Sequence, residues 1–149
     1  TLGVMLAGAL LGWRRGALAV LVVLALCAVG LPVLAGGRGG LGVFAGPTAG
    51  FLFGWAPGAA LTGYLVERAR RLTPWSVGGA VLLGGVGVIH VLGIAGMVLR
   101  GGLSLQAALV ADAVFVPGDL IKVAIASFAA LTVHRALPDL LPLRTHGGD

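Results

Sequence analysis

Long apolar runs alternate with short charged or glycine-rich stretches along the 149 residues of the chain. A helix needs about 20 apolar residues to cross the hydrocarbon core of a bilayer. The pattern predicts five apolar membrane segments, at residues 2–11, 17–34, 43–66, 77–99 and 119–137. The first segment is only about ten residues long, so we interpret it as the tail of a span.

The stretches between these runs are typical of turns and loops. They comprise charged turns at residues 13–15 and 67–71, a glycine-rich loop at 36–40 and a second glycine pair at 101–102. Residues 103–116 are mostly apolar but include Gln106 and Asp112, which suits an interfacial helix or a re-entrant piece. Residues 138–149 form a polar tail.

Composition supports this pattern. Hydrophobic residues make up 58% of the chain and charged residues only 10%, against about 25% in soluble domains, and the mean hydropathy is +1.07. We therefore expect an all-α integral membrane protein whose residues 1–149 form a single compact bundle embedded in the lipid bilayer. The net charge of +5 comes from short basic clusters between apolar runs, which indicates membrane topology and not a nucleic-acid partner.

The basic residues also predict an orientation. Two arginines, Arg38 and Arg100, fall on one side of the predicted segments. Seven fall on the other side: Arg14, Arg15, Arg68, Arg70, Arg71, Arg135 and Arg144. Because cytoplasmic loops carry the excess of basic residues, the second side is predicted to be cytoplasmic, together with the C-terminus. Asp119 and Lys122 are then expected on or near the outer face.

The strongest candidate for a ligand site is the pair Asp119 and Lys122, at the start of the last apolar segment. Pro117 and Gly118 suit a helix start, and Asp119 in the first turn would meet the positive end of the helix dipole. Lys122, the only lysine, follows three residues later on the same helix face. Charged residues within spans mark functional sites or neutralise each other, and both interpretations stay open.

A second candidate is the stretch Gly46-Pro47-Thr48-Ala49-Gly50-Phe51. Its glycines allow close approach to the backbone, Thr48 supplies a hydroxyl group and Phe51 a flat apolar surface. Glycines also recur every four residues from position 42 to position 58, which is typical of helix packing. We expect packing for Gly54 and Gly58, and ligand contact at the Gly46 end.

Other polar residues give weaker signals. His90 has no carboxylate, cysteine or second histidine nearby in its own segment, so we interpret it as a packed or hydrogen-bonded helix residue. Asp112 could not be assigned a role, and Cys27 is interpreted as a small core residue. The chain has no phosphate-binding glycine loop and no nucleophile beside a base, and the scattered His90, His134 and His146 do not suggest a catalytic set. We expect no enzyme activity, no cofactor and no bound metal.

Two stretches resemble a known family. Residues 30–40 followed by 46–54, and then Val116-Pro117-Gly118-Asp119-Leu120-Ile121-Lys122, closely resemble the BioY family, the biotin-binding S components of energy-coupling-factor (ECF) transporters. Family members usually have six helices, which implies that a first helix precedes Thr1. They also tend to have a tyrosine where this chain has Phe51, so Phe51 carries over only as a packing surface.

The resemblance implies a function. Biotin would bind in an outward-facing pocket, with substrate contacts from Gly46, Thr48, Gly50, Phe51, Asp119 and Lys122. Asp119 would accept a hydrogen bond from the ureido ring, and Lys122 would donate to either the ureido carbonyl or the carboxylate. The implied partners are a transmembrane coupling subunit and two cytoplasmic ATPases, in the prokaryotic cell membrane. An S component for another vitamin, or a solitary membrane carrier, is the alternative.

Overall fold

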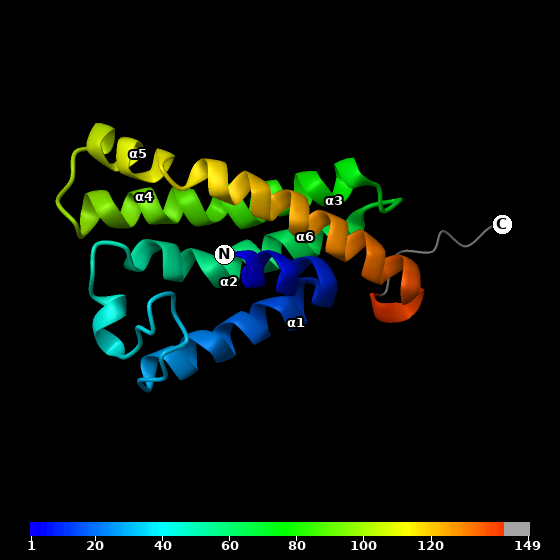
Figure 1. The fold of residues 1–149 in the computed structure, drawn as a ribbon, viewed down its shortest axis with the longest axis horizontal. Coiled ribbons are helices and arrows are strands. Elements are labelled where there is room, and N and C mark those ends of the chain that lie inside the picture. The colour runs from blue at the N-terminus through cyan, green and yellow to red at the C-terminus, as the bar shows by residue number, and fades with distance from the viewer. Residues whose placement is uncertain (142–149) are drawn as a thin grey trace.

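The computed structural model describes residues 1–141, which form a bundle of helices without a β-strand (Figure 1). The helices are α1 (Leu2–Ala28), α2 (Ala49–Arg68), α3 (Pro74–Val81), α4 (Ile89–Leu99), α5 (Leu105–Ala113) and α6 (Val116–Ala136). A π-helical stretch, η2 (Leu82–Val88), joins α3 to α4, and the short 3-10 turns are η1 (Leu41–Phe44) and η3 (Pro138–Leu140). Four helical stretches in this part of the chain are long and apolar enough to cross a membrane: 2–28, 49–68, 74–99 and 116–136.

Helix α1 is folded into two limbs at Gly12. The backbone there has φ 79° and ψ −178°, a conformation that interrupts the helix and that L-residues with a side chain rarely adopt. The second limb packs back on the first, since a Cβ at Gly16 would lie 2.6 Å from the carbonyl oxygen of Ala7 (Figure 1). The backbone N–H of Trp13 donates to Glu67 Oε1 on α2 over 3.0 Å. The two limbs thus correspond to the predicted segments 2–11 and 17–34.

Two predicted boundaries were wrong. The second segment was expected to continue to Leu34, but the helix ends at Ala28, because the Gly30-Leu31-Pro32 sequence cannot extend it. The third was expected from Val43, but α2 begins at Ala49, so Gly42 and Gly46 lie outside the helix. The remaining segments agree: residues 74–99 are helical throughout, and the last span covers the predicted range.

The glycines that do lie on α2 make it pack closely on the α3–α4 arm. A Cβ at Gly54 would lie 2.9 Å from Ile89 Cα, and one at Gly58 would lie 2.7 Å from the carbonyl oxygen of Gly84. Gly50 meets Gly96 in the same way, with 2.9 Å to Gly96 Cα. Small residues let helix backbones approach closely in lipid, where packing drives association. The packing role predicted for Gly54 and Gly58 is confirmed.

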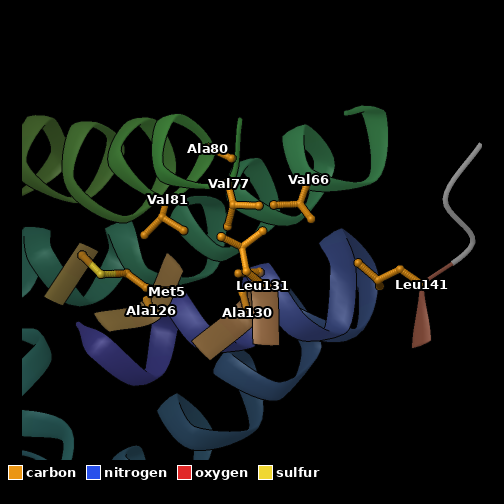
Figure 2. Close-up of a cluster of buried hydrophobic side chains, with 10 residues drawn as sticks. Met5, Val66, Val77, Ala80, Val81, Ala126, Ala130, Leu131 and Leu141 are labelled. Carbon is orange, nitrogen blue, oxygen red and sulfur yellow. The ribbon is translucent and has the colours of Figure 1, made fainter. Parts of the chain in front are cut away.

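A cluster of small and branched side chains holds the first limb of α1 to α2, α3 and α6. Figure 2 shows Val66, Val77 and Leu131 directed toward one another from α2, α3 and α6, with Met5 of α1 and Val81 of α3 beside them. Met5, Val66, Val77 and Val81 have no exposed surface. This cluster fixes α6 against α1, and so places the beginning of α6 near Thr1.

The two ends of the bundle differ in charge. The turn within α1, the α2–α3 loop and the end of α6 lie at one end, and the α1–α2 connection and the α4–α5 loop lie at the other (Figure 1). The first end carries Arg14, Arg15, Arg68, Arg70, Arg71 and Arg135, and the second carries Arg38 and Arg100. The arginines are therefore divided between the ends as predicted, except that Arg144 lies outside the described residues.

Candidate functional site

A polar cluster lies inside the bundle where α4, α5 and α6 meet. Its members are His90 at the start of α4, Asp112 in the last turn of α5, and Asp119 and Lys122 in the first turns of α6. His90 Nδ1 lies 2.7 Å from Asp112 Oδ2, and His90 Nε2 lies 2.9 Å from Asp119 Oδ2. Lys122 Nζ lies 2.8 Å from Asp119 Oδ1. The four side chains form one continuous hydrogen-bonded network.

Local sequence explains the geometry of the Asp119–Lys122 pair. Pro117 lies in the first turn of α6, where its missing N–H is not needed, and Asp119 is the acidic residue of that turn. A separation of three residues brings the two side chains to the same face, where they form the predicted ion pair. Pairing and placement at the helix start were therefore predictable from sequence.

Asp119 is the most deeply buried member, with 3% of its surface exposed. Thr1 Oγ1 donates to Asp119 Oδ1 over 2.9 Å, in addition to the bonds from Lys122 and His90. Lys122 differs, because 41% of its side chain is exposed while its Nζ also donates to Thr1 Oγ1 over 3.2 Å. The carboxylate is thus held by three donors, and the ammonium group remains accessible.

The site lies deeper in the bundle than the sequence suggested. Helix α5 packs along α4 and leads almost directly into α6 (Figure 1). Nine helical residues at about 1.5 Å each separate the α4–α5 loop from the end of α5. Asp119 and Lys122 follow this helix, and their position on or near the outer face of the membrane stays a prediction. Their environment is the interior of the bundle.

Sequence reasoning missed His90 and Asp112 as members of the site. It found no acid near His90 because it considered only one apolar segment, whereas the two carboxylates come from α5 and α6. A usable signal existed in the spacing of Asp112 and Asp119. Seven residues are about two helical turns, so two acids at this spacing share a face if the intervening residues are close to helical. Val114 and Phe115 do have helical dihedral angles.

The residues of the Gly46–Phe51 stretch are placed differently from one another. Phe51 reaches the polar cluster, since its ring centroid lies 6.1 Å from that of His90 and 6.0 Å from that of Phe115. Thr48 is exposed and precedes α2 without a side-chain capping bond, and Gly46 has open space around its Cα. Gly50 is buried against α4. Only Phe51 of this stretch contacts the cluster directly.

A cavity of about 290 Å³ begins beside the cluster. Thr1 contributes to its wall and also contacts Asp119 and Lys122, while the rest of the wall is mainly apolar, including Val4, Val23 and Trp55. This volume is near the lower end of the range of small-molecule sites. The arrangement suits a small molecule with a polar group at one end of an apolar body.

Fold and site together define a multi-pass helical membrane protein with an internal polar site beside an apolar cavity. The BioY family profile matches residues 1–139, so the chain belongs to the BioY family. It is 53% identical to the biotin transporter BioY of Rhodobacter capsulatus, over 97% of this chain and 81% of that protein. It is 48% identical to the biotin transporter BioY of Rhizobium etli, over 97% of this chain and 80% of that protein.

A solved structure supports the same assignment. The S-component for biotin from an ECF-type ABC transporter superposes with a TM-score of 0.84 at 31% identity, covering 90% of this chain and 72% of that chain. The similarity extends over most of the bundle, so it includes the elements that carry the polar cluster.

Proposed function

We propose that this protein captures biotin within the membrane and acts as the S component of an ECF-type transporter. The observation that carries the proposal is the buried Asp119 paired with Lys122, both bonded to Thr1 in the wall of an apolar cavity, in a chain of the BioY family. Biotin has matching chemistry, since a polar ureido ring and a carboxylate are joined by a thioether ring and an aliphatic chain. The names of the Rhodobacter and Rhizobium relatives support the same substrate.

The hydrogen-bonding capacity of the pair fits both polar groups of biotin. A carboxylate offers about four acceptor positions, of which Asp119 uses three, so it accepts one ureido N–H. An ammonium group has three donors, of which Lys122 uses two, so it donates to the ureido carbonyl or to the carboxylate of biotin. Phe51 offers its ring to the apolar part of the ligand.

The remaining predicted contacts lie at the outer end of α2. Thr48 has an exposed hydroxyl group free of any capping bond, and Gly46 leaves its backbone open to a ligand. We place both beside the ligand when the loop before α2 closes over it. Gly50, packed against Gly96, contributes through its backbone and sets the distance between the two helices.

Equilibrium binding of labelled biotin to the purified protein in detergent tests the proposal. Saturable binding that unlabelled biotin displaces, and that thiamine and riboflavin do not, is the expected result. Displacement by one of the other vitamins would instead indicate an S component with a different substrate. A folded sample that binds none of the three would contradict the proposed function.

Transport requires an energy source that we assign to partner subunits. A transmembrane coupling subunit and two cytoplasmic ATPases would supply it, because this chain has no phosphate-binding loop in its sequence. Co-purification with these subunits, and biotin uptake that stops when the ATPases are inactivated, are expected. Uptake by cells that lack every such subunit would favour the solitary carrier.

We also place the protein in the cell membrane with the arginine-rich end in the cytoplasm, following the distribution of basic residues. Cysteines introduced at Arg38 and at Arg70 test this orientation in intact cells. A membrane-impermeant maleimide is expected to label position 38 and not position 70. The reverse labelling pattern would invert the proposed topology.

A further inference from the structure

The contacts of His90 require one more proton than a neutral imidazole and two carboxylates possess. Both ring nitrogens lie within hydrogen-bond distance of a carboxylate oxygen, at 2.7 Å on Asp112 and 2.9 Å on Asp119. A neutral imidazole has a single N–H, and ionised carboxylates only accept. One of the two contacts would then set lone pair against lone pair. The trio Asp112–His90–Asp119 therefore holds an additional proton, on the imidazole or on Asp112.

Charge balance points the same way. With the additional proton, the trio and Lys122 together are neutral. Without it, the four groups carry one net negative charge, and the three residues of the trio are only 3% to 7% exposed. An uncompensated charge in such a place is costly, especially when the surroundings are lipid and packed helices. Proton binding is thus the condition under which this network is stable.

The second carboxylate oxygen of Asp112 indicates that the additional proton is on Asp112 and not on the imidazole of His90. Asp112 Oδ1 is buried and has no hydrogen-bond partner among the described residues. An ionised carboxylate oxygen in that position lacks compensation, whereas a protonated Asp112 leaves only a neutral carbonyl oxygen there. Asp112 would then donate from Oδ2 to His90 Nδ1, and His90 would donate from Nε2 to Asp119. This order of donors keeps the charge on Asp119, next to Lys122.

We propose that His90 and Asp112 are positioning residues of the ligand site and that the proton they share fixes Asp119 for biotin. This inference rests on the proposed function. His90 occupies Asp119 Oδ2, so Oδ1 faces Thr1 and Lys122, where the cavity begins. Asp112 acts through His90, because it contacts no other member of the network. Neither residue touches the ligand in this scheme.

The groups that face His90 determine how pH can affect the ligand site. Helix α5 contributes Asp112, α6 contributes Asp119 and Lys122, and α2 contributes only the uncharged ring of Phe51. At the start of α1, Thr1 presents its hydroxyl group to Asp119 and Lys122. Loss of the shared proton would leave one of the two His90 contacts without a hydrogen, so the imidazole could no longer hold both carboxylates. Biotin affinity is therefore expected to fall as that proton is lost.

The test measures biotin affinity of single variants and of a double variant. His90→Leu removes the donor to Asp119 and is expected to weaken binding by roughly tenfold to a hundredfold. His90→Gln, whose amide can donate to Asp119, is expected to recover part of that loss. Asp112→Leu should weaken binding less, and His90→Leu with Asp112→Leu together should be no weaker than His90→Leu alone. Additive losses would overturn the idea that Asp112 acts through His90.

A pH profile separates positioning from a merely structural role. The unmodified protein should lose affinity as the pH is raised over the range in which it stays folded. Asp112→Asn should lose less affinity over the same range, because an amide donates to a neutral His90 without an added proton. Identical profiles for both proteins, or a flat profile for the unmodified one, would overturn the proposal.

Controls keep the two hypotheses apart. His134, on α6, is a second buried histidine. Its Nε2 lies 2.8 Å from the carbonyl oxygen of Ala9, outside the network. His134→Gln should leave both affinity and pH profile unchanged. Thermal melting in detergent identifies variants that do not fold. If a leucine variant fails to fold, the affinities of the conservative variants His90→Gln and Asp112→Asn test the proposal in its place. Failure of the unmodified protein to bind biotin would contradict the proposed function, whereas normal binding by all His90 and Asp112 variants would contradict only this inference.

Discussion

His90 Nε2 lies 2.9 Å from Asp119 Oδ2, although 29 positions separate the two residues in the chain. This contact joins α4 to α6 inside the bundle, and the other oxygen of Asp119 receives Lys122 from α6 and Thr1 from the start of α1. One carboxylate therefore connects three parts of the fold. A change at Asp119 is expected to affect both the ligand site and the positions of its neighbours.

Asp119→Asn should strongly weaken biotin binding. The amide keeps the shape of the side chain but loses its charge, so Lys122 is left without its counter-ion, and one of the two acceptor oxygens becomes an NH2 donor. Hydrogen bonds to charged groups contribute about 1.5–3 kcal/mol, which corresponds to a loss of roughly 10- to 150-fold. Calorimetric titration with biotin would measure the change.

A control for that variant is available in the same chain. Asp139 is an exposed acid in η3, far from the network in sequence and contacts, so Asp139→Asn removes one negative charge without touching the site. It should bind biotin as the unmodified protein does. Equal affinities for Asp119→Asn and Asp139→Asn would refute the assignment of Asp119.

Lys122→Met tests whether Lys122 binds the carboxylate of biotin or its ureido carbonyl. Methionine keeps an unbranched apolar stem but removes all three donors. If Lys122 binds the carboxylate, the unmodified protein should prefer biotin to biotin amide, and Lys122→Met should lose that preference. If it binds the ureido carbonyl, both ligands should weaken equally.

Competition binding with the two ligands would decide between these outcomes. Arg135→Met provides the matched loss of a cation, since Arg135 is exposed at the opposite end of α6. It should change neither affinity nor preference. Undiminished binding of both ligands by Lys122→Met would remove Lys122 from the site.

The sequence predicted the parts of this protein that depend on local physics. Apolar runs gave the spans, and proline and aspartate at positions 117 and 119 gave the start of α6 together with the ion pair to Lys122. The start of α2 was misplaced because the prediction followed the apolar run from Val43 through the Gly46-Pro47 pair, which is itself a turn signal. Its loop conformation depends on contacts beyond that stretch, such as the bond from Arg100 Nη1 to the carbonyl oxygen of Phe44.

The role of His90 could not be predicted by considering one segment at a time. Its two acidic partners follow it by 22 and 29 positions, and they approach it only because α5 folds back along α4. The depth of Asp119 was missed for the same reason. Hydropathy marks which residues enter the membrane, but the direction of a short helix such as α5 depends on its packing partners.

Gly54→Ala should destabilise the bundle although alanine is the better helix former. A Cβ there would lie 2.9 Å from Ile89 Cα, so α2 and α4 would have to separate. Overpacking of this kind costs typically about 1–3 kcal/mol. Gly79→Ala is the matched control, because nothing lies within 4 Å of a Cβ at that helical position and stability should stay equal or rise. Thermal melting in detergent would compare them, and equal melting temperatures would contradict the close α2–α4 contact.

Gly12→Ala should loosen the fold of α1. Alanine at φ 79° and ψ −178° adopts a conformation that is almost restricted to glycine and costs roughly 1–3 kcal/mol, and its methyl group would also collide with the side chain of Glu67. Displaced Glu67 would no longer accept from the N–H of Trp13, so the turn between the two limbs would lose its bond to α2. Gly79→Ala, at a helical glycine with nothing within 4 Å of its Cβ, is again the control. We expect a lower melting temperature for Gly12→Ala alone, together with weaker biotin binding, because the limb that it releases carries Thr1 to Asp119. Unchanged melting of Gly12→Ala would contradict the need for glycine at this turn.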